Sequence, residues 1–488
     1  MSTATGPATP PTDPASEASE PVPEDPAGVL GRRYRTATLG VVLVVMLMAF
    51  ESMAVTTVMP VVARDLDGLA LYAWGFSATL IAGVPANVLA GGWVDRSGPT
   101  RPMLTGLAAF VAGLVIAGVA ADMWTFVAGR AVQGLGTGIA MVAVYVLIAR
   151  VYPDRLRSRV FAALSAAWVL PSLVGPAVGG AAAQHLGWRW VFLGLVPLVV
   201  PPTVMLIPVM RGLRRSRPSD GAGTRAGRRY LGAIAAAVGA AALLYGLDHP
   251  GWAVVPLIAA GLAGLAAGLP PLLPAGTLRM RRGLPSIVLV RGLLSGAFLG
   301  MDVFIPLALT SLHGFSPTKA GLVLTVSALG WTAASQFQGR SSRPRAFFVL
   351  VGAVLLTMGI VTSTLVLQVT GWPSALTWTI GGAGMGFAIG SISVLLLDLS
   401  PEEEQGANSS ALQIADTLGG SLVVGVAGAL VTAFGTHRLA QALGVAGALL
   451  AAIAVVGIIA ALRLEARATG FGALRTRLAR GARSEGSS

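Results

Sequence analysis

The stretch Pro171–Gly180 reads PSLVGPAVGG and lies in the middle of an apolar run from Val160 to Ala183. Two prolines and three glycines within ten residues would weaken a helix in a soluble core, because proline removes a backbone donor and glycine is flexible. A membrane helix tolerates them, since neighbouring helices and cavity water satisfy the freed backbone groups. The stretch therefore predicts a membrane helix that carries a hinge or a close-packing seam.

The composition of the whole chain agrees with a membrane protein. Of 488 residues, 54% are hydrophobic and 11% are charged, and the mean hydropathy is +0.75, which lies outside the range of soluble globular domains. Cysteine is absent, so disulfides, thiol catalysis and cysteine metal sites are excluded. We find no P-loop, nucleotide fingerprint or metal-ligand cluster. We therefore expect no enzyme activity, no cofactor, no metal and no ATP-driven pump.

Apolar runs of about 20 residues predict the membrane spans. The first 35 residues are rich in Pro, Ala, Ser, Thr and acidic residues, and we expect a disordered cytoplasmic tail there and not a signal peptide. After it we predict fourteen helices, near residues 37–60, 73–93, 102–120, 124–149, 160–183, 190–210, 230–247, 252–273, 285–309, 321–338, 346–367, 375–398, 409–433 and 440–462.

The arginines test this count independently, because cytoplasmic loops carry an excess of positive charge. With both termini inside, 28 of the 34 Lys and Arg fall on the cytoplasmic side, and the outer side receives four of them: Arg64, Arg189, Lys319 and Arg438. The acidic loop Ser400–Gln405 is an exception, but acidic residues weigh little in this rule. The net charge of +13 therefore indicates topology and contact with membrane lipids, and no nucleic acid partner.

The spacing of the predicted helices gives a 6+2+6 plan. We expect an N-terminal six-helix bundle over residues 36–210, a basic loop with two extra helices over 211–284, a C-terminal six-helix bundle over 285–462, and a basic cytoplasmic tail over 463–488. Transporters that work by rocking are built from two repeated bundles, with the substrate site near the midplane between them.

A glycine-rich turn follows the second predicted helix. It resembles the cytoplasmic signature of the major facilitator superfamily, G-x3-D-R-x-G-R-[RK], which is matched by Gly91, Asp95, Arg96, Gly98 and Arg101 and interrupted by Pro99. Gly98 allows a turn with positive φ, and Asp95 and Arg96 suit helix termini of opposite polarity. By this resemblance Asp95 would latch onto the start of the thirteenth helix, where capping groups are available at Asn408, Ser409 and Ser410. A basic turn that only sets topology is the alternative.

Arg130 lies about six residues into the fourth predicted helix, where a buried arginine costs several kcal/mol unless it has a partner or water. Glu51 in the first predicted helix lies roughly 13 Å from the outer end at Pro60, within a helical turn of the depth of Arg130. A carboxylate and an arginine at one depth can load and release a proton. The alternatives are an Arg130 that extends to the outer surface and a purely structural Glu51.

Three stretches resemble the drug/proton exporters of the same superfamily. The fourth helix matches L-x3-R-x2-Q-G-x-G at Arg130, Gln133, Gly134 and Gly136; the fifth matches the antiporter motif G-x3-G-P-x2-G-G at Gly175, Pro176, Gly179 and Gly180, with Pro171 at the first glycine. The first helix matches L-D-x-T-I-V-N-V-A-L-P at Pro60, with Glu51 at the aspartate. The resemblance implies that the antiporter motif packs against the small face of the tenth helix, which carries Gly321, Ala328, Ala333 and Ser335. A helix contact without any bearing on transport is the alternative.

Two further carboxylates, Asp302 and Asp416, fall inside predicted spans. Each is a candidate second proton site or a binding charge for a cationic substrate, and Asp416 could instead cap a helix or bond a loop. We expect Arg291 to extend to the cytoplasmic surface and to act as a topology residue.

The chain is identified as a member of the major facilitator superfamily that resembles the fourteen-helix drug/proton antiporters. The resemblance implies proton-coupled multidrug efflux of small lipophilic or cationic compounds, including antibiotics, from a monomer in a bacterial cytoplasmic membrane, with the proton gradient as the energy source. Export of a lipid or an endogenous secondary metabolite, uptake by symport, and a non-transporting sensor or scaffold are the alternatives.

Overall fold

The computed structural model describes residues 28–212, 223–248, 251–252, 254–401, 404–434 and 436–464. Helices dominate these residues, and their order along the chain follows the predicted spans. The bounds are α1 Arg35–Asp65, α2 Trp74–Ser97, α3 Thr100–Gly118, α4 Met123–Val151, α5 Asp154–His185, α6 Arg189–Leu193, α7 Leu195–Arg211, α8 Gly223–Asp248, α9 Val254–Gly268, α10 Leu284–Ser311, α11 Pro317–Arg340, α12 Arg345–Val366, α13 Ser374–Leu399, α14 Gln405–Phe434 and α15 Leu439–Ala461.

Thirteen helical segments of the described chain are long and apolar enough to cross a membrane. One of them joins α6 and α7, because Gly194 between the two keeps helical backbone angles (φ −65°, ψ −22°). The predicted eighth span is the short α9, with 15 residues. All backbone groups of a helix bond within the segment, which is the requirement for a chain surrounded by lipid. The protein is therefore an all-α, multi-pass membrane protein.

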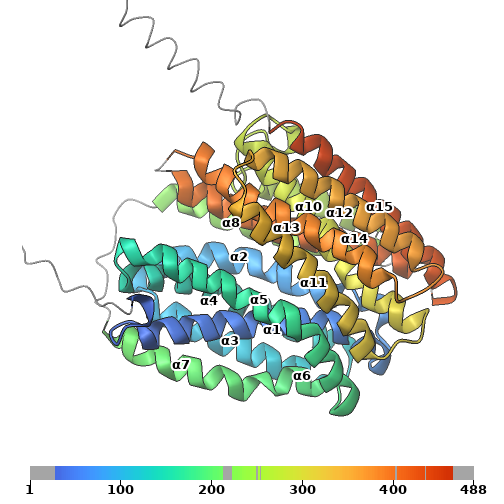
Figure 1. Ribbon diagram of the computed structural model, residues 1–488, viewed down its shortest axis with the longest axis horizontal. Coiled ribbons are helices and arrows are strands. Elements are labelled where there is room, and N and C mark those ends of the chain that lie inside the picture. Colours follow the sequence, from blue (N-terminus) through green and yellow to red (C-terminus); the bar gives the residue numbers. More distant parts are fainter. Residues whose placement is uncertain are drawn as a thin grey trace, which may run out of the picture.

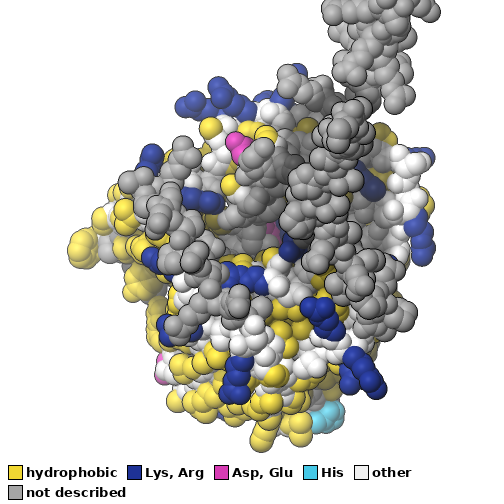
Figure 2. All heavy atoms as spheres, turned by 90° about the vertical axis from the view of Figure 1, so that its left-hand side faces the viewer, with side chains coloured by type: hydrophobic (Ala, Val, Ile, Leu, Met, Phe, Trp, Pro, Cys, Tyr) yellow, Lys and Arg dark blue, Asp and Glu magenta, His cyan; other side chains and the backbone are white. Residues whose placement is uncertain are grey.

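The helices form two bundles that lie side by side (Figure 1). One bundle contains α1 to α7 and the other contains α10 to α15. The described chain begins and ends at the same end of the molecule, on the left of Figure 1, and we call this the tail end and the opposite one the far end. Figure 2 shows the tail end, over which Lys and Arg side chains are spread.

Helix α8 packs against α2 of the first bundle and α14 of the second. Near the far end, Trp74 Nε1 on α2 donates to Asp248 Oδ2 on α8 at 2.5 Å. Near the tail end, an Arg229 guanidinium nitrogen on α8 donates to Ser410 Oγ on α14 at 3.4 Å. Buried side chains of α2, α8 and α14, with Leu272 after α9, form a small apolar cluster of their own: Val84, Ala233, Ala236, Leu272, Ile414 and Leu418. Helix α8 therefore covers the groove between the bundles on the α2 and α14 side.

On the opposite side of the molecule, the bundles meet through α5 and α11. Toward the far end Thr318 Oγ1 donates to Gln184 Oε1 at 2.8 Å. Toward the tail end both helices expose apolar side chains, among them Leu170 at 53% and Phe337 at 61%. A groove of about 450 Å³ opens beside Phe337, between Ala333 and Ser341. The seam between α5 and α11 is thus closed at the far end.

Candidate functional site

The first bundle buries an ion pair between α1 and α4. Glu51 and Arg130 are each 4% exposed, and Arg130 Nη1 donates to Glu51 Oε1. Arg130 Nη1 also donates to Gln133 Oε1 at 2.8 Å, and Arg130 Nε donates to the Gly75 carbonyl at 2.9 Å. Gln133 Nε2 completes the network by donating to Glu51 Oε1 at 3.2 Å. The predicted proximity of Glu51 and Arg130 is confirmed as geometry, and Arg130 does not extend to the surface.

Small residues on α4 allow this network to form. A Cβ atom on Gly134 would lie 2.1 Å from the Thr79 carbonyl oxygen of α2, so the two backbones approach closely. The Thr79 hydroxyl donates to the Arg130 carbonyl at 3.1 Å and ties the same turn of α4 to α2. Gly136 faces α3 in the same manner, next to Phe110. The resulting position of Arg130 lets its guanidinium reach both Gly75 on α2 and Glu51 on α1.

Asp122 is the N-cap residue of α4, at the far end of the molecule. Its carboxylate accepts from the backbone N–H of Thr125 at 2.9 Å and from the Thr125 hydroxyl at 2.6 Å. These hydrogen bonds favour the charged form, and that from the Thr125 hydroxyl contributes most to holding the pKa of Asp122 below its usual value. Asp122 therefore acts as an N-cap in its ionised state.

The glycines of the fifth-helix motif face two different helices. Cβ atoms on Gly175 and Gly179 would lie 3.0 Å from Met53 and 2.8 Å from Ala54 on α1, within one turn of Glu51. A Cβ on Gly180 would lie 2.5 Å from the Pro317 carbonyl oxygen of α11, on the other bundle. Helix α5 runs unbroken through Pro171 and Pro176, so the structure has a close-packing seam and not a break.

The expected contact between this seam and the tenth predicted helix, α11, is confirmed at one position. A Cβ on Gly321 would lie 2.2 Å from the Pro176 carbonyl oxygen. The expectation is wrong further along α11, where Ser335 donates to the Gly386 carbonyl of α13 at 3.2 Å and Ala333 is exposed. Ser335 lies about 21 Å along the helix from Gly321, and at that level α11 packs against α13 of its own bundle.

At the tail end, the turn after α2 has the predicted backbone. Gly98 has φ +77°, and Arg96 Nε donates to the Gly92 carbonyl of its own helix at 2.9 Å. Gly91 lies in the last turns of α2 and Arg101 is exposed in the first turn of α3. The side chain of Asp95 lies outside the described part of the chain.

The residues that were expected to offer capping groups to Asp95 at a helix start lie inside the helix instead. Helix α14 begins at Gln405, so Asn408, Ser409 and Ser410 lie inside its first two turns and not at its N-cap. Asn408 Nδ2 donates to Ser400 Oγ at 3.0 Å, and Ser410 Oγ accepts from Arg229. The prediction placed the helix start four residues too late because the polar residues before 409 resembled a loop.

The second bundle contains an ion pair that contradicts the prediction for Arg291 and the alternative role given for Asp416. Arg291 Nε on α10 donates to Asp416 Oδ1 on α14 at 2.6 Å, and Ser295 Oγ donates to the same oxygen. Arg291 is therefore a partner of Asp416 and not a topology residue at the surface, and Asp416 neither caps a helix nor bonds a loop. Glycines bring the two helices together, since a Cβ on Gly292 would lie 2.8 Å from the Ala415 carbonyl oxygen.

Asp302, on α10, has a different environment. Trp378 Nε1 on α13 donates to Asp302 Oδ1 at 3.0 Å, and the indole itself is fully buried. Sequence reasoning missed Trp378, because no short-range signal connects residues 76 positions apart on two helices. It also missed Tyr72, whose hydroxyl crosses from the first bundle and donates to the Val303 carbonyl at 2.7 Å.

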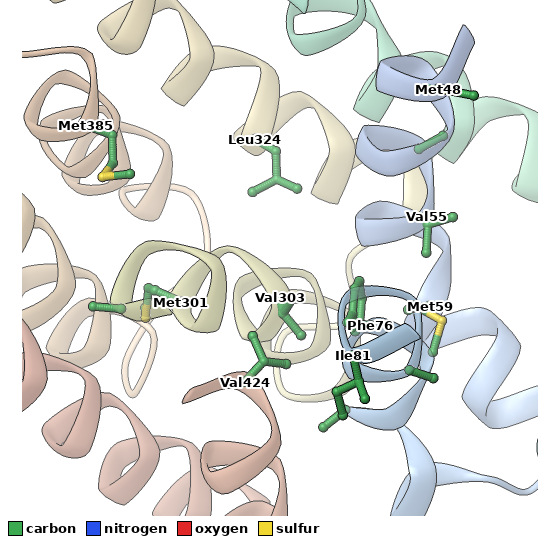
Figure 3. Close-up of a cluster of buried hydrophobic side chains, with 14 of the residues drawn as sticks. Met48, Val55, Met59, Phe76, Ile81, Met301, Val303, Leu324, Met385 and Val424 are labelled. Carbon is green, nitrogen blue, oxygen red and sulfur yellow. The ribbon is translucent and has the colours of Figure 1, made fainter. Parts of the chain in front are cut away.

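Apolar side chains fill the region where the two bundles meet (Figure 3). Phe76 and Ile81 of α2 lie opposite Val303 of α10 and Val424 of α14. Further buried apolar residues of α1, α11 and α13 surround them: Met48, Val55, Met59, Leu324 and Met385. These side chains belong to the main buried hydrophobic core, which extends across both bundles.

Two helix bundles that meet along a buried apolar interface are an architecture of membrane transporters. The chain belongs to the Major Facilitator Superfamily, whose family model matches residues 41–422. The family and the fold are those of transporters and not of enzymes.

Similar proteins include named drug transporters. A probable multidrug-efflux transporter of Mycobacterium tuberculosis is 29% identical over 452 residues, which cover 87% of this chain and 93% of the relative. The multidrug transporter protein MdtP of Bacillus subtilis is 23% identical over 414 residues, covering 81% of this chain and 74% of the relative.

Solved transporter structures share the fold. A POT family transporter in complex with 5-aminolevulinic acid superimposes with a TM-score of 0.64 at 13% identity, covering 88% of this chain and 96% of that structure. A D-xylose-proton symporter gives a TM-score of 0.61 at 15% identity, with coverage of 86% and 97%. At these identities the likeness concerns the fold alone.

Proposed function

We propose that the protein is a proton-coupled antiporter that exports amphiphilic and lipophilic compounds across the cytoplasmic membrane, with both termini in the cytoplasm. In this proposal Glu51 exchanges protons and Arg130 controls its charge. The names of the relatives from Mycobacterium tuberculosis and Bacillus subtilis support the cargo class. The basic residues at the tail end support a cytoplasmic location of that end.

The observation that carries the proposal is the buried network of Glu51, Arg130 and Gln133. A carboxylate inside the membrane is stable as a charged group only with a cation at hydrogen-bonding distance, and Arg130 provides one. Protonation of Glu51 would remove its charge and leave Arg130 with Gln133 and the Gly75 carbonyl. Loading a proton therefore changes the forces that hold α1 to α4.

Packing contacts of α5 connect the proposed proton site at Glu51 to the other bundle. Met53 and Ala54 follow Glu51 on α1 and contact Gly175 and Gly179 of α5. Helix α5 also contacts α11 of the other bundle, where Gly180 meets Pro317 and Pro176 meets Gly321. A small shift of α1 on protonation would thus displace the far-end seam. The proton and the substrate then compete for the transporter in its inward-facing and outward-facing states, and this competition couples proton entry to substrate export.

The proposal is tested in everted membrane vesicles whose lumen is acidified by respiration. Lipophilic compounds added to wild-type vesicles should release the pH gradient, because each imported compound exchanges for protons that leave the lumen. Vesicles with Glu51→Gln should show no release. Glu404→Gln is the matched control, because it makes the same chemical change at an exposed residue outside the membrane spans.

Release by Glu51→Gln equal to the wild type would exclude Glu51 as the proton carrier. Wild-type everted vesicles that accumulate no compound and release no gradient, over a panel of cationic, neutral and acidic lipophilic drugs, would contradict drug/proton antiport and favour lipid or secondary-metabolite cargo.

A further inference from the structure

One face of α11 is exposed along most of the helix. Its exposed residues follow one another at intervals of three or four, which places them on one side of the helix. They are Leu322, Val326, Leu329, Ala333, Phe337 and Arg340. Other sides of α11 are occupied, since Gly321 meets Pro176 of α5 and Ser335 donates to the Gly386 carbonyl of α13. The exposed face therefore points away from the bundle interface and toward the surrounding lipid.

The part of this face near the tail end is hollowed. The groove of about 450 Å³ is lined by Ala333, Gln336, Phe337, Arg340 and Ser341. Arg340 lies about 10 Å further along the helix than Ala333. The groove thus continues an apolar face at its inner end and carries a guanidinium and a hydroxyl where it reaches the tail end. A phospholipid has the same order of groups, with its acyl chains inside the membrane and its phosphate at the surface.

Hydrogen bonds fix the end of α11 that forms the polar part of the groove. Arg345 Nη1 on α12 donates to the Gln338 carbonyl at 2.8 Å. The buried Gln338 side chain donates through Nε2 to Ser391 Oγ of α13 at 3.0 Å. Both neighbouring helices therefore hold the last turn of α11, and Arg340 and Ser341 have a defined place beside the groove.

Aromatic rings support the apolar part of the groove. The ring of Phe337 meets the ring of Phe348 on α12 at 6.4 Å and 76°, and that of Phe387 on α13 at 6.1 Å and 79°. Phe348 and Phe387 stack on each other at 5.5 Å and 25°. Phe337 is thus held from behind by two helices while its outer side stays exposed, and aromatic rings at this level are common where a membrane helix meets the lipid surface.

The charge of the groove favours an anion. Arg340, Arg343 and Arg345 fall within six residues that contain no Asp or Glu. Among the ion pairs of the described residues none involves Arg340, whose side chain is exposed. The Arg343 guanidinium lies 5.1 Å from the centre of the Phe347 ring and adds a second positive charge nearby. A guanidinium binds phosphate oxygens well, and a basic pocket on the cytoplasmic side of membrane helices suits an anionic head group.

We propose that the groove of α11 binds one anionic phospholipid, with its phosphate at Arg340 and Ser341 and an acyl chain along Phe337, Ala333 and Leu329. A free phosphate ion would gain nothing from the apolar part of the groove, and a zwitterionic head group would bring a further cation to two arginines. This inference goes beyond the proposed transport function and does not depend on it, because the ligand is a component of the membrane and not a cargo.

The test measures lipid selectivity at the groove itself, in the full-length protein reconstituted into phosphatidylcholine bilayers. The chain has no cysteine, so Ser342→Cys, at an exposed residue next to the groove, carries a single bimane fluorophore. Bilayers with increasing fractions of brominated phosphatidylglycerol or brominated phosphatidylcholine quench this fluorophore according to how often each lipid is its neighbour. The ratio of the two association constants should favour phosphatidylglycerol by about fivefold or more.

Arg340→Gln in the labelled protein should lower this ratio by about fivefold, because the charge nearest to the phosphate is lost. Arg340→Lys should retain most of the ratio. Arg211→Gln, the same change at an exposed arginine at the tail end of α7, should leave it unaltered.

A second label position separates a built site from the general attraction of basic surfaces for anionic lipid. Bimane at Gly212→Cys is exposed at the tail end beside Arg211, and there the ratio should stay below twofold. Inorganic phosphate at 10 mM, compared with chloride at equal ionic strength, should leave the ratio at Ser342→Cys unaltered.

Equal ratios at the two label positions would overturn the assignment. So would an Arg340→Gln ratio within twofold of that of the labelled parent, since the exposed Arg340 would then have no part in lipid selectivity. Loss of the ratio in inorganic phosphate would assign the arginine to a free anion and overturn the lipid as the occupant.

Discussion

Arg291 and Asp416 lie 125 residues apart in the sequence and form an ion pair with an Nε to Oδ1 distance of 2.6 Å. The pair joins α10 to α14 at the level of Gly292 and Ala415, where the two backbones approach closely. The side chains keep 13% and 23% of their surface exposed, so the pair is only partly shielded from solvent. The second bundle thus has its own arginine and carboxylate pair, as the first bundle has Glu51 and Arg130.

We predict that Asp416→Asn and Arg291→Gln each lower the stability of the protein by about 1–3 kcal/mol, because each leaves one charge without its partner. The double variant should lose less than the sum of the single losses, since no unpaired charge remains. Thermal unfolding of the four proteins in detergent measures this cycle. Additive losses would mean that the pair contributes nothing to stability.

Arg130→Lys should reduce gradient release by at least about tenfold, while the protein still folds. The guanidinium reaches Glu51, Gln133 and the Gly75 carbonyl at the same time, and a lysine ammonium lacks the planar fork for these three directions. The everted-vesicle assay measures the loss, and Arg438→Lys, at the exposed last residue of the 3-10 helix before α15, provides the matched control. Wild-type rates in Arg130→Lys would show that only the positive charge matters.

Gly321→Ala should weaken the far-end seam. Its new Cβ would lie 2.2 Å from the Pro176 carbonyl oxygen, which is fixed backbone, so α5 and α11 must separate. We expect a protein that opens more readily at the far end and transports more slowly. Accessibility of a cysteine placed at Thr318 to a membrane-impermeant maleimide, added from the far side, should rise severalfold over the same cysteine with Gly321 intact.

A cysteine pair can lock the same seam, and the chain has no cysteine of its own to interfere. Thr318 Oγ1 donates to Gln184 Oε1 at 2.8 Å, so the two side chains already meet across the bundles. We predict that Gln184→Cys with Thr318→Cys forms a disulfide under mild oxidation and stops transport, and that a reductant restores it. Each single cysteine variant should transport normally with and without oxidant.

The N-cap of α4 should give a pH-dependent contribution to stability. The pKa of Asp122 is lowered in the folded protein, chiefly by the Thr125 hydroxyl, so its contribution is present above the unfolded pKa of about 3.9 and is lost as the pH falls through the lower folded value. The melting temperature of Asp122→Ala should therefore lie below that of the wild type at pH 7, and the difference should shrink in the acid range. An equal difference at pH 7 and pH 3 would contradict this.

The spans and the proximity of Glu51 to Arg130 could be predicted because both depend on short-range patterns. Runs of apolar residues reveal membrane helices, and the helical rise places Glu51 and Arg130 at one depth without any knowledge of packing. The positive φ of Gly98 follows from the same kind of local reasoning.

Contacts set by tertiary packing could not be predicted in this way. Arg291 resembles a residue at a helix end until α14 brings Asp416 to it. Trp331 and Trp378 resemble ordinary apolar residues of two helices, and only the packing of α10, α11 and α13 gathers them around Asp302 and Phe298. Helix α11 also changes its packing partner along its length, from α5 at Gly321 to α13 at Ser335. The residue pattern does not reveal this change.

The position of α8 makes the two sides of the molecule unequal toward the surrounding lipid. On one side a helix bonded to α2 through Asp248 and to α14 through Arg229 stands between the bilayer and the bundle interface. On the other side α5 and α11 form the boundary themselves, with Leu170 and Phe337 exposed to hydrocarbon chains toward the tail end. Lipid acyl chains can therefore reach the seam between α5 and α11 directly, whereas α8 screens the seam between α2 and α14 from them.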